Sequence, residues 1–378
     1  MTGIYRIALK LLVNDKSKFT ALLVGITFAV FLMVMMMSTF SGIIARSCAP
    51  VYNIGAKVWV MDPAVNNTNS SIPIPDYVLS MARSIPGVKY AVPLYYGGGQ
   101  VKLKDGIYQA VTVVGLDDAT LFGRPEMLEG KIEDIFAENA FLVVKDAEFA
   151  KLENPKIGTE FEINDNRGVV VGIAKVASSG LFGVPTLYTT YNRAITYIPT
   201  ARFTTSYVLI EPKSDTDVPR IQRDIARLGY EALTRDQFVK KIASFYTYKT
   251  GIGMNILMMT TISFIVGLSI SGQTFYNFII ENLEKFGAMK AIGAKGRELI
   301  SMILFQAFFT AIIGYGLGVG AASSFIIFAK LRLPDYASQL TFTTMGFALV
   351  MVVIIAGVSS YIGVRKVLQI QPFDIFRG

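Results

Sequence analysis

Long stretches without charge alternate with charged segments along this chain, and the alternation predicts its main elements. Four stretches contain no Asp, Glu, Lys or Arg and cover residues 19–45, 250–280, 299–329 and 342–364. An α-helix rises 1.5 Å per residue, so about 20 apolar residues cross the hydrocarbon core of a bilayer. We therefore predict four transmembrane helices at these positions, with the other segments outside the membrane.

Residues 1–18 show a second pattern, with helical spacing. The apolar positions are Ile4, Ile7, Ala8, Leu11 and Leu12. The basic positions are Arg6, Lys10, Lys16 and Lys18. This separation predicts an amphipathic helix that lies on the inner face of the membrane.

Residues 46–249 are typical of a folded, mixed α/β domain inserted between the first two transmembrane helices. Short β-type runs occur at 57–60, 88–93, 100–103, 108–115, 160–163, 169–176 and 207–210. Pro and Gly separate such runs, as at 85–87 and at Gly97-Gly98-Gly99, where we expect turns. A helix–glycine–strand unit occurs at 75–93 and again at 218–233. We expect an α/β base built from both ends of the domain, with a mostly β insertion over about 115–205.

The end of this domain carries a helix-start signal. Thr234 is followed by Gln237 three residues later, as in a capping box. Helical periodicity then continues, so we predict a stalk helix over 235–249 that runs without a break into the second transmembrane helix. A continuous helix of this kind would carry motion from one side of the membrane to the other.

Composition and charge agree with a membrane protein. Hydrophobic residues make up 52% of the chain and charged residues 17%, below the roughly 25% typical of soluble domains. Residues 46–249 are nearly neutral, with 23 Lys/Arg and 22 Asp/Glu. The basic surplus lies in 1–18, in 281–298 and in the tail 365–378, which places both termini and the 281–298 segment in the cytoplasm. The inserted domain and the short 330–341 loop are then extracytoplasmic, and no nucleic-acid footprint is expected.

The residues available for chemistry are few. The chain has one cysteine, Cys48, and no histidine, which excludes the usual zinc and haem ligand sets. It contains neither a G-x-x-x-x-G-K-[ST] phosphate loop nor a G-x-S-x-G elbow. We expect no catalytic residue, no bound metal and no bound cofactor. Cys48 is interpreted as a small apolar filler, with a lipidated or intermolecular cysteine as the alternative.

The charged segment 281–298 separates two transmembrane helices. Its apolar residues recur every three positions at Leu283, Phe286, Met289 and Ile292. This spacing predicts a short amphipathic helix that ends at Gly293, with Gly296 as a second break. Two interpretations remain open from the residues alone: a coupling element that contacts a partner, or a plain connector.

Glycines make one part of the third predicted transmembrane helix narrower. Gly316 and Gly320 form a G-x-x-x-G pair, which allows two helix backbones to approach closely. We expect these two residues to serve helix packing, with a hinge as the alternative.

The run Asn-Leu-Glu-Lys-Phe-Gly-Ala-Met-Lys-Ala-Ile-Gly-Ala at 282–294 resembles the cytoplasmic signature of the MacB/FtsX-like ABC transporter permeases, and looks most like DevC-type permeases. The matching residues are Phe286, Gly287, Lys290, Ala291, Gly293 and Ala294. Lys285 occupies the position of the motif's glutamate, with Glu284 just before it, and Gln306 stands where many members have an acidic residue. The segment 181–199 and the Gln371-Pro372 pair near the end also look similar to this family.

The resemblance implies a role for the 281–298 segment, namely coupling to an ATPase. The residues it assigns to this role are Glu284, Lys285, Phe286, Gly287, Met289, Lys290, Ile292, Gly293, Ala294 and Arg297. It further implies a homodimer in the bacterial inner membrane, in contact with membrane lipids and with two cytoplasmic ABC ATPase subunits that use ATP and Mg²⁺. In a two-membrane cell a periplasmic membrane-fusion adaptor and a TolC-like outer-membrane channel would complete the route.

Two functions fit this resemblance. The first is the permease subunit of an ABC exporter, which couples ATP hydrolysis in the partner to movement of its periplasmic domain. The alternative is an FtsX-like regulator of a cell-wall hydrolase that moves no substrate. A sensory receptor would need a longer cytoplasmic segment, and a secondary transporter would need inverted repeats with polar midplane sites.

Overall fold

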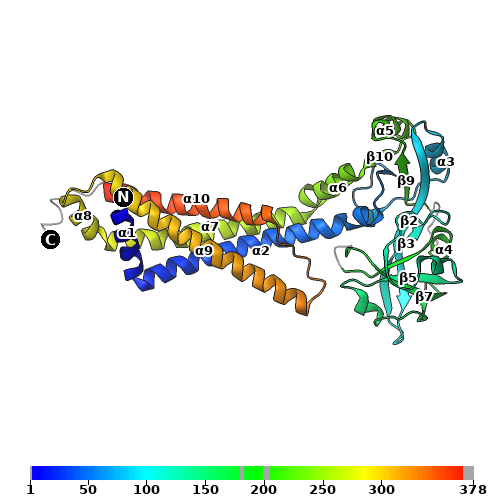
Figure 1. Ribbon diagram of the computed structural model, residues 1–378, viewed down its shortest axis with the longest axis horizontal. Helices are drawn as coiled ribbons and strands as arrows, with labels where there is room; N and C mark the ends of the chain where they lie inside the picture. Colours follow the sequence, from blue (N-terminus) through cyan, green and yellow to red (C-terminus); the bar gives the residue numbers. More distant parts are fainter. Residues whose placement is uncertain (1, 179–182, 199–204, 369–378) are drawn as a thin grey trace. The chain divides into compact units, whose positions relative to one another are not determined.

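The computed structural model describes residues 2–178, 183–198 and 205–368, and the chain divides into two compact units (Figure 1). The helical unit comprises Met1–Gly42, Ile252–Arg332 and Ser338–Gly378. The sheet unit comprises Ile43–Gly251 and Leu333–Ala337. The last ten residues of the predicted tail, including Gln371-Pro372, lie outside the described residues, as do 181, 182 and 199 of the 181–199 segment.

The helical unit contains four helices that are long and apolar enough to cross a membrane. They are α2 (Lys16–Ile54), α7 (Gly251–Glu281), α9 (Gly296–Arg332) and α10 (Phe342–Leu368). They lie along one another in Figure 1 and coincide in position with the four predicted transmembrane stretches. The shorter α1 (Thr2–Asn14) and α8 (Leu283–Ala291) belong to the same unit.

Glycines bring α9 close to α2, but not the two that we predicted. A Cβ on Gly314 would lie 2.7 Å from Ile26 Cγ2, and one on Gly318 would lie 2.6 Å from Val30 Cβ. By contrast, no atom lies within 4 Å of such a Cβ at Gly316 or Gly320. Gly316 and Gly320 make no such contact among the described residues, so the packing role predicted for them stays a prediction. Because each helical residue turns by 100°, a shift of two residues moves a glycine to the opposite side of the helix.

The base of the sheet unit uses strands from both ends of the inserted segment. Strand order is β10-β1-β9-β2, all antiparallel. The strands are β1 (Val58–Met61), β9 (Tyr207–Pro212), β10 (Glu231–Thr234) and the first part of β2 (Val88–Lys102). Helices α3 (Tyr77–Ser84) and α5 (Val218–Arg227) cover one face, where an aliphatic cluster includes Val58, Val60, Val78, Ile221 and Ile225.

The opposite face of the base is covered by α6 (Arg235–Ser244). Trp59 lies between the alternating residues of β1 that face α3 and α5, so it points to the other side of the sheet. Its ring packs against Phe238 of α6 at 5.5 Å and against Tyr207 at 5.3 Å, between centroids. All three side chains are at most 1% exposed, so these aromatic contacts hold α6 against the sheet.

The rest of the sheet unit is mostly β, as the insertion was expected to be. Beyond β2 the order is β3-β8-β5-β7-β4, with β6 pairing β2 and β7. The strands are β3 (Tyr108–Leu116), β4 (Glu126–Glu129), β5 (Ala140–Val144), β6 (Glu160–Ile163), β7 (Asn166–Lys175) and β8 (Thr186–Thr190). The helical elements of the sheet unit not yet given are α4 (Tyr191–Tyr197), η1 (Thr68–Ser70), η2 (Ile132–Phe136), η3 (Phe149–Leu152) and η4 (Asp215–Asp217).

Strand β2 joins the two parts of the sheet, and it corrects one prediction. Gly97-Gly98-Gly99 does not form a turn but lies inside β2, paired with residues 111–113 of β3. A Cβ on Gly97 would lie 2.5 Å from the hydroxyl of Tyr95, and one on Gly99 would lie 3.1 Å from Ile198 Cδ1. These glycines therefore make room for larger side chains on the strand rather than a reversal of the chain.

The predicted stalk helix is interrupted. The capping box at its start is present, since Thr234 Oγ1 accepts from Gln237 N at 3.3 Å and Gln237 Oε1 accepts from Thr234 N at 2.8 Å. A π-helix (η5, Phe245–Lys249) follows α6, and Thr250 is extended, with φ −111° and ψ 157°, before α7 starts. The Thr250 hydroxyl donates to Tyr246 O at 2.8 Å, a local bond that competes with helix continuation.

The expectation of one unbroken helix from 235 to 280 is therefore wrong. Helix α2, by contrast, continues without a break past residue 45 and Pro50 and ends at Ile54, which belongs to the sheet unit.

Candidate coupling site

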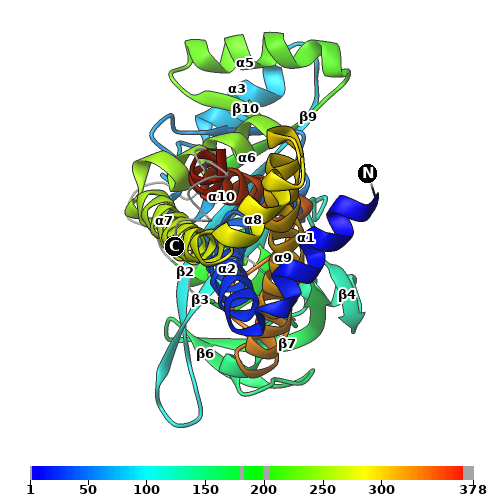
Figure 2. The same cartoon turned by 90° about the vertical axis from the view of Figure 1, so that its left-hand side faces the viewer.

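Helix α1 is fixed to α9 by three contacts within the helical unit (Figure 2). Gln306, which is fully buried, donates from Nε2 to Ala8 O at 2.8 Å. The Tyr5 hydroxyl lies 3.0 Å from Ser301 Oγ, and its ring lies 5.0 Å from that of Phe305. The Gln306 amide thus bonds the α1 backbone.

A charged elbow connects α1 to the start of α2. Lys18 donates from Nζ to Asp15 Oδ2 at 2.7 Å and from its backbone N to Asp15 Oδ1 at 3.2 Å. These hydrogen bonds to Lys18 lower the pKa of Asp15. Lys18 also forms an ion pair with Glu281, the last residue of α7. We call Asp15, Lys18 and Glu281 the elbow cluster; it joins α1, α2 and α7.

The 281–298 segment forms a helix between two turns. Asn282 ends α7, where its Nδ2 donates to Phe278 O at 2.8 Å and its Oδ1 accepts from Lys285 Nζ at 2.7 Å. Helix α8 then runs over Leu283–Ala291. Gly293 closes it with φ +106°, the left-handed conformation expected of a C′ glycine. Gly296 is the first residue of α9.

The predicted coupling residues divide into buried and exposed sets. Phe286 is fully buried and Gly287 is buried with it. Met289, Lys290 and Ala294 are partly exposed, and Lys290 Nζ donates to Leu368 O at 3.4 Å. The exposed members are Glu284, Lys285, Ile292, Gly293 and Arg297. Among these Ile292 stands out, because 88% of this large apolar residue is in solvent.

This division changes the expected roles. The stripe of Leu283, Phe286, Met289 and Ile292 is not one continuous inward face, because Ile292 lies just past the end of α8. Phe286 fixes α8 to the helical unit. The exposed surface of this segment is made by Ile292 and the charged residues around it.

A groove beside α1 adds to this surface. It has a volume of about 800 Å³. It is lined by Ile7, Leu9, Lys10, Leu11, Val13, Asn14, Lys16 and Lys285. Three lysines on apolar walls suit a segment that carries both apolar and acidic side chains. Sequence periodicity predicted helix α1 but could not show that Lys285 of α8 closes one side of this groove.

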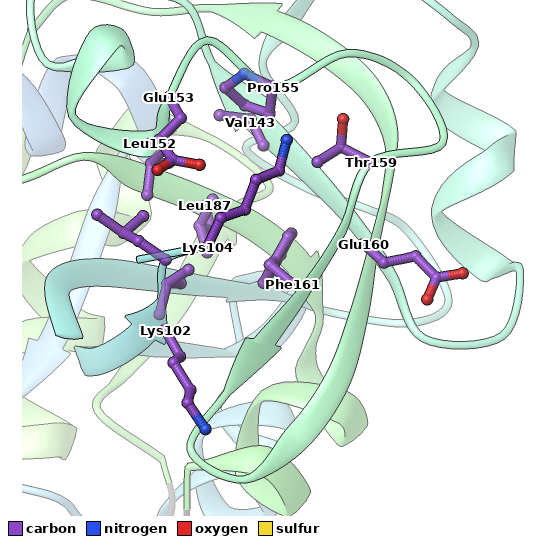
Figure 3. A pocket seen from close by; sticks show the side chains of 12 residues that line it. Lys102, Lys104, Val143, Leu152, Glu153, Pro155, Thr159, Glu160, Phe161 and Leu187 are labelled. Atoms are coloured by element: carbon purple, nitrogen blue, oxygen red, sulfur yellow. The ribbon is translucent and has the colours of Figure 1, made fainter. Parts of the chain in front are cut away.

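The sheet unit offers a smaller hollow in its β-rich part (Figure 3). Its walls include Val143, Leu152, Phe161 and Leu187, with Lys104 at the rim. Its volume is about 40 Å³, whereas pockets for small molecules measure about 300–1,000 Å³. This hollow is smaller than such pockets.

Four membrane-length helices, an α/β domain inserted after the first, and a short helix between the second and third define a multi-pass membrane protein with an inserted domain. The chain matches the MacB-like periplasmic core domain over residues 20–228. It matches the FtsX-like permease C-terminal domain over residues 256–372. The chain belongs to the MacB/FtsX-like family of ABC transporter permeases, which confirms the family resemblance and the predicted fold class.

Individual relatives agree with this family. An uncharacterised ABC transporter permease of Mycobacterium tuberculosis (strain CDC 1551 / Oshkosh) is 24% identical over 338 residues, 87% of this chain and 86% of the relative. A protein of Staphylococcus haemolyticus (strain JCSC1435) that carries the name of hemin transport system permease HrtB is 23% identical over 150 residues. That match covers 40% of this chain and 41% of the relative.

Solved structures similar to this chain include two domains from outside the membrane. The extracellular domain of the ABC-type transporter YknZ from Gram-positive bacteria gives a TM-score of 0.36 at 14% identity, over 47% of this chain and 99% of that domain. The periplasmic region of MacB from Actinobacillus actinomycetemcomitans gives a TM-score of 0.37 at 11% identity, over 51% of this chain and 95% of that region. Membership of the permease family implies an ABC ATPase as partner and a non-catalytic role for this chain.

Proposed function

We propose that this chain is the permease subunit of an ABC exporter and that it transmits force from a separate ATPase to its sheet unit. In this proposal a homodimer lies in the bacterial inner membrane, with α1, α8 and both termini in the cytoplasm and the sheet unit in the periplasm. Two ATPase subunits bind and hydrolyse ATP with Mg²⁺. A membrane-fusion adaptor and a TolC-like channel receive the substrate on the far side.

The exposed Ile292 is the observation that carries the proposal. Burial of a large apolar side chain against a partner is favourable, because it removes apolar surface from water. Ile292 lies in a turn that is closed by the left-handed Gly293 and followed by Lys295 and Arg297. An apolar side chain beside basic residues suits a cleft with acidic rims on the ATPase.

The helical unit provides a route from this turn to the spans. Phe286 holds α8 in the unit, and Gln306 and Tyr5 hold α1 on α9. The elbow cluster joins α1 to α2 and α7. A push on α8 or α1 therefore reaches α2, α7 and α9 through short side-chain contacts.

Co-purification tests the proposal. The full-length tagged chain is isolated from native membranes in mild detergent, as wild type and as Ile292→Asp. Leu331→Asp serves as the matched control, because Leu331 is 77% exposed and lies at the far end of α9. We expect an ABC ATPase with the wild type and with the control, and about 30-fold weaker binding to Ile292→Asp, which corresponds to about 2 kcal/mol for an interface anchor.

The partners recovered with the ATPase separate the two functions of this family. An adaptor protein supports the exporter, whereas a peptidoglycan hydrolase without an adaptor supports the FtsX-like regulator. Equal recovery of ATPase with Ile292→Asp and with wild type would exclude the turn at Ile292 as the contact.

A further inference from the structure

Five charged side chains from three parts of the chain meet inside the sheet unit. Arg46 comes from α2, Asp146 and Glu148 from the loop before η3, Lys151 from η3, and Asp335 from the segment that connects α9 to α10. All five belong to the sheet unit. None was singled out from the sequence, because these three parts lie far apart along the chain. We call these five residues the latch cluster.

The contacts of the latch cluster are short. Arg46 Nη1 lies 3.1 Å from Glu148 Oε1, and Arg46 Nη2 donates to Pro334 O at 3.4 Å. Lys151 Nζ lies 2.5 Å from Asp335 Oδ2. The connecting segment is thus held at Pro334 by α2 and at Asp335 by η3.

Gly183 lies at the centre of the cluster and shows how tightly it is packed. Lys151 Nζ donates to Gly183 O at 2.6 Å. A Cβ on Gly183 would lie 2.8 Å from Lys151 Nζ and 3.0 Å from both Asp335 Oδ2 and Glu148 Oε1. A Cβ at this position would push the charged ends of these side chains aside, and the φ of +59° also favours glycine.

The two carboxyl groups of the loop lie next to each other, with Glu148 buried and Asp146 partly buried. The Glu148 side chain is 0% exposed, and its backbone N donates to Asp146 Oδ1 at 3.0 Å. Asp146 Oδ2 and Glu148 Oε2 are both buried without a hydrogen-bond partner among the described residues. Nor do the described residues contain a group of three or more potential metal ligands. A proton shared by the two carboxyl groups would satisfy both oxygens.

The charges of the cluster balance only when it holds that proton. Arg46 and Lys151 supply two positive charges, and Asp146, Glu148 and Asp335 supply three negative charges when all are ionised. The phenol of Tyr188 on β8 also faces Asp146, and it stays neutral because burial raises its pKa. One proton on the carboxyl pair makes the cluster neutral, whereas its loss leaves an excess negative charge in a buried site.

We propose that the latch cluster is a proton-dependent latch, closed on the segment Leu333–Ala337 when the Asp146–Glu148 pair holds one proton and loosened when that proton leaves to solvent. Through this segment the latch is continuous in the chain with α9 and α10, and through Arg46 with α2. The latch would make the hold on the connecting segment depend on the acidity of the compartment around the sheet unit.

The expected pH range follows from the carboxyl pair. Burial, together with the neighbouring Asp146, raises the pKa of Glu148 to about 7 from its ordinary 4.5. Burial also raises the pKa of Asp146. Between pH 4.5 and about 7, the latched chain binds a proton that the unlatched chain releases. The latch is therefore fully closed below 4.5, the ordinary pKa of a glutamate, and it opens as pH rises through about 7.

Spin-label mobility in the full-length chain tests the latch. Leu333, which is 62% exposed, is replaced by labelled cysteine in a Cys48→Ala background, and the chain is placed in lipid nanodiscs. We expect an immobilised label at about pH 6 and a growing mobile fraction toward about pH 8.5. Glu148→Gln keeps the acceptor for Arg46 and supplies a permanent donor for Asp146, so its label should stay immobilised at both pH values.

Two further variants complete the test. Glu138→Gln, at an exposed carboxyl of the same unit, should keep the wild-type response. Asp335→Asn removes the anchor for Lys151 and should give a mobile label at both pH values. Label mobility that is independent of pH in the wild type, or an unchanged pH response in Glu148→Gln, would overturn the proposal.

Discussion

The chain contains two charged clusters that differ in their access to water. In the elbow cluster the side chains of Lys18, Asp15 and Glu281 are 24%, 31% and 55% exposed. In the latch cluster Glu148 is 0% and Arg46 13% exposed, whereas Lys151 and Asp335 are 34% and 37% exposed, so the difference lies in the Arg46–Glu148 pair. An exposed ion pair contributes about 0–1 kcal/mol, whereas breaking a buried one costs about 3–5 kcal/mol. Loss of an ion pair in the elbow cluster should therefore cost little stability, whereas loss of the buried Arg46–Glu148 pair in the latch cluster should cost more.

The largest effect is expected from Arg46→Met. The substitution leaves buried carboxyl groups without their cation, so we expect a loss of about 3–5 kcal/mol in the free energy of unfolding at about pH 8.5. The loss should be smaller at about pH 6, where the Asp146–Glu148 pair holds a proton. Denaturant unfolding of the full-length chain in detergent measures it.

Arg124→Met is the control for this prediction, because Arg124 is an exposed arginine of the same unit. Its effect should stay within about 0.5 kcal/mol, as for most surface substitutions. Equal losses in the two variants would remove the distinction between the clusters.

A smaller effect is expected where α9 packs on α2. Gly318→Ala places a methyl group 2.6 Å from Val30 Cβ and 2.8 Å from Thr27 O, and overpacking of this kind costs about 1–3 kcal/mol. Gly320→Ala, on the open side of the same helix, should be neutral or slightly stabilising. Denaturant unfolding of the full-length chain in detergent compares the two variants. A greater loss of unfolding free energy for Gly320→Ala would mean that this residue contacts a second copy of the chain.

The smallest effect is expected at the elbow. Lys18→Met should lower the free energy of unfolding by about 0–1 kcal/mol, because its partners are partly in water. The difference from wild type should shrink further in high salt, which screens exposed charges. Lys16→Met, at a neighbouring exposed lysine, is the control. A loss of unfolding free energy near that of Arg46→Met would show that the elbow cluster stabilises the chain as much as the latch cluster does.

Features of the fold that depend on local sequence pattern were predicted well. Charge-free stretches of sufficient length located the four membrane-length helices, and the spacing in 1–18 predicted α1. The signature at 282–294 led to the family. The capping box at Thr234 and the left-handed Gly293 also follow from residue type at a single position.

Features that depend on tertiary contacts could not be predicted in this way. Gly97-Gly98-Gly99 has the composition of a turn, but its neighbours Tyr95 and Ile198 need the space inside a strand. The apolar spacing of α8 does not tell that Phe286 is buried while Ile292 is exposed. The break at Thr250, which is extended between η5 and α7, lies within an otherwise helical pattern.

The latch cluster is the clearest case. Its charged residues have ordinary neighbours in the sequence: Arg46 lies within α2, and Asp335 lies in the segment that connects α9 to α10. Only the fold brings them to Glu148 and Lys151, so no spacing rule could have found the cluster.

The central claim is that an ATPase acting on α8 moves parts of the sheet unit. The most direct test is a distance between spin labels at Lys156→Cys and Leu333→Cys, both exposed positions of the sheet unit, in a Cys48→Ala chain reconstituted with its ATPase. The account predicts that ATP changes this distance and that Ile292→Asp abolishes the change. An unchanged distance while the ATPase hydrolyses ATP would contradict it.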